Sequence, residues 1–318
     1  MHVIFGIGPV GWSTMEALRE RGERVRVVSR RVPEHLPQGI QHIAADALDA
    51  AAVATACKGA TVVYQCLNAP YHRWATLFPP LQRAVVKGAQ QAGARFVSFE
   101  NVYMYGLPDQ GHVNEASPHA PCSQKGETRS QMAQSLGDLH QSGALKVAQV
   151  RASDLFGPGM RYSALGDEIF ARAVAGKTPR GIGGLSHAHT WTYTVDAGKT
   201  LARVGTDPHA FGQVWHVPSA KARTLAQVCQ SVGEQINRPI KPGLTPAWML
   251  RMIGLFVPPA GAMVEMLYQF DRDYIVDDAA TRAELGIVHT PFDQALSRTL
   301  DWFKNPGALP TKDHSLAS

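Results

Sequence analysis

Apolar and polar positions alternate along the first half of the chain in the pattern of a parallel sheet with helices between its strands. Short apolar runs predict strands at residues 1–5, 24–29, 40–44, 60–67, 95–99 and 146–151. Longer segments with apolar residues at helical spacing predict helices at residues 12–20, 47–57 and 74–92. The run 60–67 is mostly apolar, as in a strand that a parallel sheet buries on both faces. We therefore expect an α/β fold with a doubly wound parallel sheet.

The first predicted strand ends in a glycine-rich turn. Gly6, Gly8 and Gly11 form Gly-x-Gly-x-x-Gly directly after the apolar run, and a predicted helix follows. The first glycine permits a tight turn, the second lets a pyrophosphate approach the main chain, and the third lets the helix pack on the strand. The helix start offers free N–H groups to the phosphates. The motif predicts dinucleotide binding, although similar turns occur in α/β proteins without a nucleotide.

The end of the second predicted strand bears on which dinucleotide is bound. Ser29, Arg30 and Arg31 stand where NAD-selective folds carry an acid for the ribose 2′-hydroxyl. A hydroxyl with guanidinium groups suits a 2′-phosphate, because arginine makes bidentate charge-assisted bonds to it. We expect NADP, with NAD as the alternative; two solvated surface arginines would be the simpler explanation. The expected cofactor residues are Gly6, Gly8, Pro9, Val10, Gly11, Ser29, Arg30, Arg31, Asp46, Leu67, Asn68, Ala69 and Arg129.

Composition narrows the class of protein. The chain of 318 residues is 45% hydrophobic and 18% charged, which is ordinary for a globular protein. Its four cysteines have no paired spacing, which argues against a disulfide framework or a zinc site and fits a reducing cytoplasm. No apolar run reaches about 18 residues, and the chain opens on a strand, so we expect neither a membrane span nor a signal peptide.

The net charge of +5 is concentrated near the predicted phosphate site, in arginines between residues 19 and 31. We find no nucleic-acid motif and no lysine-rich tail. The expected partner is a small-molecule substrate, without nucleic acid or membrane, and a homodimer is possible.

Four stretches resemble the extended and atypical short-chain dehydrogenase/reductases, the NAD-dependent epimerase/dehydratase group. They are the glycine turn and residues 95–106, 151–159 and 189–196. The C-terminal part is similar to that group as well, so the resemblance covers residues 1 to about 304. We expect a dinucleotide-binding core mainly in 1–160, a substrate-binding part mainly in 161–304 and interleaved with the core, and a loose tail at 305–318.

The resemblance implies a Tyr and, four residues later, a Lys on one helix face, with a Ser or Thr at the preceding strand end. Aligned on the shared motifs, Asn101 stands at the Ser/Thr position, Lys125 at the Tyr and Arg129 at the Lys. Lys125 and Arg129 are i and i+4 neighbours that repel each other, which would make Lys125 a usable acid near neutral pH. Arg129 could bind ribose hydroxyls or a substrate carboxylate. The alternative is a solvated helix face.

Tyr103 and Asp154 complete the candidate catalytic set. Tyr103 lies near Asn101 and could supply the missing phenol, or simply pack. Asp154 follows a predicted strand at the end that faces the ligand crevice, and it either contacts substrate or caps a turn. His187 and His189 lack a carboxylate or third ligand at suitable spacing, so we expect no metal site.

Two further features of the second half are a single aspartate with an expected structural role and a long apolar segment. Asp196 resembles the N-cap of the following helix. Residues 246–270 are apolar and helical, with a break at Pro258 and Pro259. They line a substrate pocket, or belong to the core or an oligomer contact. An interfacial helix is disfavoured by their few charges.

Two functions follow from these features. One is an NADP-dependent oxidoreductase or epimerase/dehydratase-like enzyme that acts on a small carbonyl or hydroxyl compound with a non-standard catalytic set. The other is a non-catalytic NADP-binding redox sensor similar to the NmrA-like members. Loss of the Tyr favours the sensor. The intact loop after Asp154 and the apolar C-terminal segments favour the enzyme.

Overall fold

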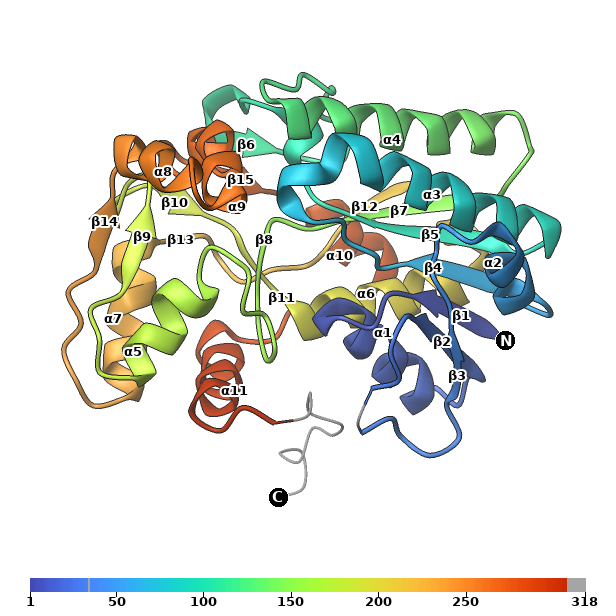
Figure 1. The fold of residues 1–318 in the computed structure, drawn as a ribbon, viewed down its shortest axis with the longest axis horizontal. Helices are drawn as coiled ribbons and strands as arrows, with labels where there is room; N and C mark the ends of the chain where they lie inside the picture. Colours follow the sequence, from blue (N-terminus) through green and yellow to red (C-terminus); the bar gives the residue numbers. More distant parts are fainter. Residues whose placement is uncertain (34, 308–318) are drawn as a thin grey trace.

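The computed structural model describes residues 1–33 and 35–307 and contains the predicted doubly wound sheet (Figure 1). Seven parallel strands lie in the order β12-β7-β5-β4-β1-β2-β3. They are β1 (His2–Phe5), β2 (Val25–Ser29), β3 (Gln41–Ala44), β4 (Val62–Gln65), β5 (Arg95–Glu100), β7 (Val147–Arg151) and β12 (Val214–His216). The strand order reverses between β1 and β4, which is where such sheets open a ligand crevice at the carboxyl ends of their strands. The predicted fold class is confirmed.

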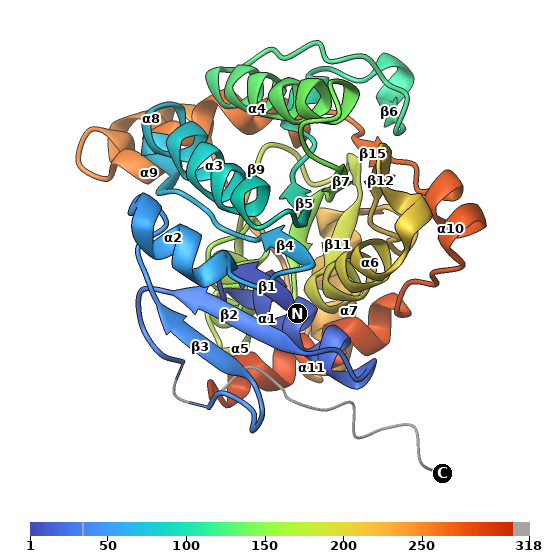
Figure 2. The same cartoon turned by 90° about the vertical axis from the view of Figure 1, so that its right-hand side faces the viewer.

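Helices cover both faces of this sheet (Figure 2). One face carries α1 (Pro9–Glu20) and α6 (Thr194–Thr206), and the other carries α2 (Ala50–Cys57), α3 (Trp74–Gln91) and α4 (Gln124–Gln141). Alternate side chains of β1 serve the two faces, because Ile4 joins the apolar cluster under α1 and α6 while Val3 and Phe5 join the cluster under α2 and α3. Burial on both faces explains why these strands are apolar throughout.

The chain builds a second, smaller part after β7. Its strands are β8 (Asp154–Phe156), β9 (Arg180–Ile182), β10 (Ala188–His189), β11 (Trp191–Tyr193), β13 (Arg223–Thr224) and β14 (Gly243–Thr245). Its helices are α5 (Arg172–Val174), α7 (Leu225–Gln235), α8 (Ala247–Gly254), α9 (Pro258–Ala262) and α11 (Phe292–Lys304), with a 3₁₀ helix η6 (Val264–Gln269). A core of aromatic rings centred on Phe156 holds it together. Because α6 and β12 return to the first part, the two parts alternate along the chain.

The remaining elements are short. They are η1 (Tyr71–Arg73), η2 (Tyr103–Tyr105), η3 (Asp109–Gly111), β6 (His112–Val113), a π-helical segment η4 (Gly166–Ala171), η5 (Pro208–Ala210), β15 (Ile275–Val276) and α10 (Ala279–Leu285). Residues 308–318, most of the predicted tail, lie outside the described residues.

A side-chain cap moves the predicted start of one helix, and an expected cap of another helix is absent. α2 begins at Ala50 because the Asp49 carboxylate accepts hydrogen bonds from two N–H groups of the first turn, at 2.9 and 3.1 Å. The expectation that Asp196 is an N-cap is wrong. β11 ends at Tyr193 and α6 starts at once, so Asp196 lies inside the first turn, where it accepts from the N–H and hydroxyl of Thr290, each at 2.7 Å.

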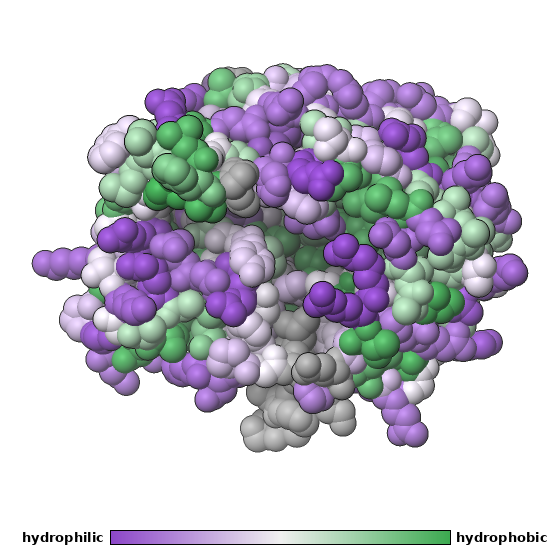
Figure 3. Space-filling view, in the orientation of Figure 1, coloured by the Kyte–Doolittle hydropathy of each residue, from purple (hydrophilic) through white to green (hydrophobic). Residues whose placement is uncertain are grey.

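The apolar segment 246–270 forms the predicted broken helices, with α9 starting at Pro258. The expectation of a core position is wrong for α8, in which only Leu250 is buried. Trp248 is 62% exposed and Phe256, just after the helix, is 86% exposed. They contribute to the apolar patch over α8 and α9 at the upper left of Figure 3. An oligomer contact here stays a prediction.

Candidate functional site

The glycine turn joins β1 to α1 at the carboxyl edge of the sheet. Gly6 has φ +92°, and a Cβ there would lie 2.7 Å from the carbonyl oxygen of Cys66. A Cβ on Gly11 would lie 1.9 Å from the carbonyl oxygen of Gly6. By contrast, a Cβ on Gly8 would meet no atom within 4 Å, so the space in front of the α1 N-terminus is open. These are the three roles that the motif predicts.

This turn forms one wall of a cleft of about 960 Å³. Nine expected cofactor residues line the cleft: Gly6, Gly8, Ser29, Arg30, Arg31, Asp46, Leu67, Asn68 and Ala69. Pro9, Val10 and Gly11 form the first turn of α1, directly after Gly8. Arg129, also expected at the cofactor, lies buried against the ring of Phe78, 4.8 Å from its centroid, rather than on the cleft wall.

The end of β2 presents two exposed cations to this cleft. Arg30 and Arg31 are exposed, and neither guanidinium forms an ion pair with another residue in the described part of the chain. The Ser29 hydroxyl is already engaged, since it donates to the Arg31 carbonyl at 2.7 Å and lies 3.0 Å from Nε2 of His42. The arginines are therefore better placed than the serine to receive an anion. Sequence reasoning missed His42, which a neighbouring strand brings beside Ser29.

Lys125 is buried at the start of α4 and held from the C-terminal part. Its Nζ forms an ion pair with Glu265 of η6 and donates to the Ala262 carbonyl at 2.9 Å. The ring of Tyr71 lies 4.5 Å from the ammonium. The Glu265 carboxylate also accepts from the N–H of Gln124 at 2.7 Å. Glu265, which sequence reasoning missed, thereby offsets the repulsion expected between Lys125 and Arg129.

Arg129 pairs with a different carboxylate, that of Glu100. It is 1% exposed, and its Nη2 lies 3.9 Å from Oε1 of Glu100. Glu100 also accepts from Nε of Arg151 at 3.0 Å and from the Ser98 hydroxyl at 3.1 Å. Burial lowers the pKa of Arg129, and the nearby Glu100 carboxylate opposes this shift. Nε and Nη2 of Arg129 have no hydrogen-bond partner within the described residues, so this buried cation still has donors to offer.

Asn101 and Tyr103 sit at the end of β5 among aromatic rings. The Asn101 side-chain oxygen accepts from the Tyr103 N–H at 3.2 Å and so caps the turn. The Tyr103 ring stacks on Trp74, and its hydroxyl lies 3.5 Å from that of Tyr71. Burial raises the pKa values of Tyr71 and Tyr103, so both phenols are protonated near neutral pH. They can donate hydrogen bonds there.

Asp154, the first residue of β8, pairs with His189, the last residue of β10. β8 and β11 run parallel with Asp154 opposite Trp191, and Oδ2 of Asp154 lies 2.9 Å from Nε2 of His189. His189 is 2% exposed, and its Nδ1 lies 3.1 Å from the carbonyl oxygen of Gln269. The fold brings this carboxylate to His189 from 35 residues away, a distance along the chain that no metal-ligand spacing covers. Among the described residues no three possible ligands come together as a metal site.

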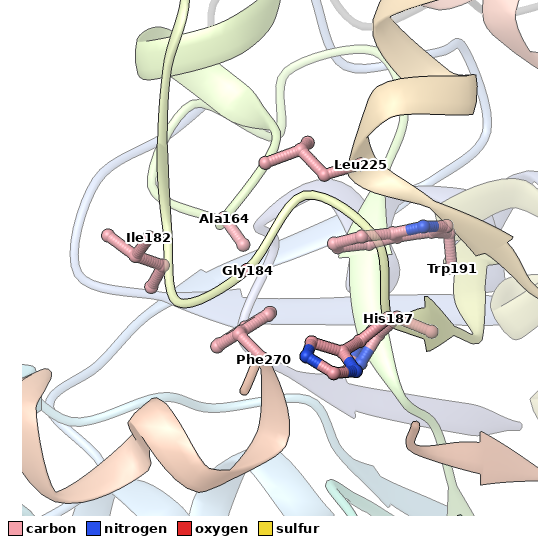
Figure 4. A pocket seen from close by; sticks show the side chains of 8 residues that line it. Ala164, Ile182, Gly184, His187, Trp191, Leu225 and Phe270 are labelled. Carbon is pink, nitrogen blue, oxygen red and sulfur yellow. The ribbon is translucent and has the colours of Figure 1, made fainter. Parts of the chain in front are cut away.

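Aromatic and aliphatic side chains close the space beside this pair. Figure 4 shows Trp191, Leu225, Ile182 and Phe270 converging from separate segments. The cavity between them has a volume of about 10 Å³, which is room for one water molecule at most. His189 is thus shielded on this side.

The model of the NAD-dependent epimerase/dehydratase family matches residues 3–217. The chain belongs to this family. The family resemblance seen in the sequence is confirmed. A comparison with curated proteins gives no match.

Solved structures share the fold of this family member over nearly its whole length. A UDP-glucose 4-epimerase from Thermotoga maritima, solved with UDP-glucose, has a TM-score of 0.78 at 16% identity and covers 96% of this chain and 99% of its own. A dTDP-glucose 4,6-dehydratase mutant from Streptomyces venezuelae, solved with NAD, has a TM-score of 0.76 at 17% identity, with 96% and 97% covered. A UDP-glucuronic acid 4-epimerase from Bacillus cereus, also solved with NAD, has a TM-score of 0.77 at 13% identity, with 96% and 99% covered. These identities establish the fold alone.

In this family member the candidate residues fall into two groups. The glycine turn and the β2 arginines share the large cleft. Lys125, Tyr103 and Asp154 gather around Tyr71, the first residue of η1, which precedes α3. Sequence reasoning missed Tyr71, whose hydroxyl lies 3.5 Å from that of Tyr103 and whose ring faces the Lys125 ammonium.

Proposed function

We propose that this chain binds NADP in preference to NAD and acts as an oxidoreductase or epimerase/dehydratase-like enzyme on a small carbonyl or hydroxyl compound. One observation carries the proposal. Gly8 leaves open space at the N-terminus of α1, and the cleft of about 960 Å³ extends from that space to Arg30 and Arg31. Clefts of this size hold cofactors. NAD in the solved dehydratase and glucuronic acid epimerase supports a nicotinamide dinucleotide as the cofactor, and the preference for NADP rests on the two arginines.

Each wall of the cleft has a role in this proposal. The N–H groups of the first turn of α1 bind the pyrophosphate, assisted by the positive end of the helix dipole. Arg30 and Arg31 bind the 2′-phosphate. Asp46 and Asn68 line the remaining length. When bound, the nicotinamide supplies hydride transfer, while the protein positions the substrate and handles the proton.

The substrate belongs between the two parts, near Tyr103 and Asp154. Protonated phenols of Tyr71 and Tyr103 suit a carbonyl or hydroxyl oxygen there. Because structurally similar proteins include a dTDP-glucose dehydratase and a UDP-glucose epimerase, sugar nucleotides are one class of substrate to screen.

The second candidate is a sensor that binds NADP without turnover. It is favoured because Lys125 and Arg129, the two cations at the family's catalytic positions, already pair with Glu265 and Glu100. A screen of NADPH with aldehydes, ketones and sugar nucleotides separates the two. Turnover supports the enzyme, and its absence with every class supports the sensor.

Calorimetry of NADPH and NADH tests the cofactor assignment. We expect NADPH to bind more tightly, and Arg30→Ala to weaken NADPH by about tenfold with little effect on NADH. This is the lower end for a charged hydrogen bond, because Arg30 is exposed. Arg24→Ala removes an equal charge away from the cleft and should change neither affinity. Equal or reversed affinities in the unmodified protein would remove the NADP assignment.

A further inference from the structure

We infer that Asp154 and His189 hold one shared proton and serve as acid and base toward the substrate. This inference rests on the proposed enzyme function and names the group that handles its proton. It moves that role from α4, where the family resemblance puts it, to β8 and β10, the short strands that carry Asp154 and His189.

Hydrogen-bond accounting supports the shared proton. The Gln269 carbonyl can only accept, so Nδ1 of His189, 3.1 Å away, carries a hydrogen. Nε2 lies 2.9 Å from Oδ2 of Asp154. A bare Nε2 facing an ionised carboxylate at that distance would set two lone pairs against each other. One hydrogen therefore lies between them, and the pair holds one proton more than a neutral imidazole with a carboxylate.

The surroundings favour exchange through Asp154. His189 is enclosed by the rings of Trp191, Phe270 and Tyr274, with centroids at 4.5, 5.0 and 6.0 Å. The Asp154 side chain is 14% exposed, against 3% for that of His189. Asp154 is thus the member of the pair that can reach a substrate.

The other ionisable groups around the pair are accounted for. Burial raises the pKa of Tyr71, Tyr103 and Tyr274, and the negative charge of Asp154 raises it further. All three side chains therefore remain protonated phenols near neutral pH. Lys125 and Glu265 neutralise each other on the α4 side. His187, directly before β10, pairs with Asp273 at 3.8 Å, and both side chains are exposed. Ser153, whose hydroxyl lies 3.4 Å from Nε2 of His189, adds no charge.

The position of Asp154 in the fold suits proton transfer to a bound substrate. Asp154 begins β8 three residues after β7 ends, and Tyr103 follows β5, which pairs with β7. Both therefore lie at the carboxyl edge of the sheet. In reduction, the pair gives its proton to the carbonyl oxygen as the carbon receives a hydride, with both its electrons, from the reduced cofactor. The C=O π bond becomes C–H and O–H bonds, and oxidation returns the proton to the pair.

The first test counts protons without a substrate. In protein labelled at the histidine ring nitrogens and the aspartate side-chain carbons, His189→Gln identifies the His189 signals among the thirteen histidines by their loss. At pH 7 we expect either an imidazolium at His189 or a protonated carboxyl at Asp154. In Asp154→Asn, His189 should become a neutral ring protonated at Nδ1. A neutral His189 beside an ionised Asp154 in the unmodified protein would overturn the inference.

The second test measures turnover and NADPH affinity, using a substrate from the screen. Asp154→Asn should lower turnover about 10²- to 10⁴-fold, remove one limb of the pH profile and leave NADPH affinity unchanged. Asp207→Asn breaks an ion pair at the end of α6, away from the site, and should change none of these. Normal turnover with an unaltered pH profile in Asp154→Asn would overturn the inference. If the unmodified protein bound no nicotinamide nucleotide, the proposed function would fail, whatever the proton count showed.

Discussion

Glu100 is a buried carboxylate that serves two arginines. It accepts from Arg151 at 3.0 Å and lies 3.9 Å from Arg129, and all three residues are at most 3% exposed. One negative charge thus faces two positive ones beneath the candidate site. Charges buried in this way depend on their partners, because water cannot replace a lost contact.

We expect Glu100→Gln to lower the free energy of unfolding by about 3–5 kcal/mol, the usual cost of leaving a buried charge unpaired. Denaturant unfolding monitored by circular dichroism measures it. Asp301→Asn removes a carboxylate of an exposed pair with Lys304 and should cost no more than about 0.5 kcal/mol. A loss below 1 kcal/mol in Glu100→Gln would mean that water or another group compensates the arginines.

At the residue scale, local geometry could be predicted from the sequence and long-range partners could not. The glycine motif spans six residues, and the structure has its three roles as expected, although the atom that a Cβ on Gly6 would meet belongs to Cys66. Lys125 and Glu265 are 140 residues apart, and Asp154 and His189 are 35 apart. No spacing rule connects such pairs, because they meet only after the sheet and the C-terminal part have packed.

At the scale of elements, η6 is fastened to the start of α4. Glu265 binds the Lys125 ammonium and accepts from the Gln124 N–H at 2.7 Å, so its charge also lies at the positive end of the helix dipole. α9 packs against η1, which contributes Arg73 to the cofactor cleft. The C-terminal helices therefore close over the region between the two parts.

Glu265→Gln should loosen this closure while the sheet stays intact. The amide can still accept from the N–H but cannot pair with the ammonium, so amide hydrogen exchange should quicken across residues 258–270. Mass spectrometry of peptides measures it. Glu284→Gln on α10 removes the same charge elsewhere and should leave that exchange unchanged. Unaltered exchange in Glu265→Gln would show that packing alone holds η6.

The alternation of strands and helices was predictable because a strand buried on both faces is apolar throughout. The exposed position of α8 could not be predicted in the same way. An apolar helical pattern indicates that one face of the helix avoids water, but it does not indicate which neighbour covers that face. Within the described residues, most of the apolar face of α8 is exposed. A homodimer through this face stays a prediction.

At the scale of the whole molecule, burial acts on the protonation of three histidines in the first part. Burial lowers the pKa values of His2, His119 and His216 below the ordinary 6.5. His216 is fully buried, with its Nε2 2.8 Å from the Tyr105 hydroxyl and its Nδ1 donating to the Asp277 carbonyl at 2.7 Å. Just below pH 6.5 these histidines therefore bind protons in the unfolded chain but stay neutral in the folded protein. The stability contributed by these neutral rings is therefore complete above pH 6.5 and is lost as the pH falls through the lowered pKa values.

The melting temperature should accordingly fall between pH 7.5 and pH 5.5. His216→Gln should reduce this fall, even though its melting temperature at pH 7.5 is lower. His209→Gln, at an exposed position, should retain the full pH dependence. A melting temperature that does not fall over this range would contradict the account of the buried histidines. Differential scanning fluorimetry in a series of buffers measures it.

The glycine turn opens onto a cleft of about 960 Å³, and the proposed function depends on that cleft binding a dinucleotide. Calorimetric titration of NADPH into the unmodified protein, Gly8→Val and Gly137→Val is the direct test. Gly8 has φ −68° and no neighbour within 4 Å of a Cβ, so valine should leave the fold intact while filling the space of the pyrophosphate. Gly137, on α4 with similarly open space, is the control. We predict binding to the unmodified protein and to Gly137→Val, and none to Gly8→Val; binding of equal strength to Gly8→Val, or no binding to the unmodified protein, would contradict the account.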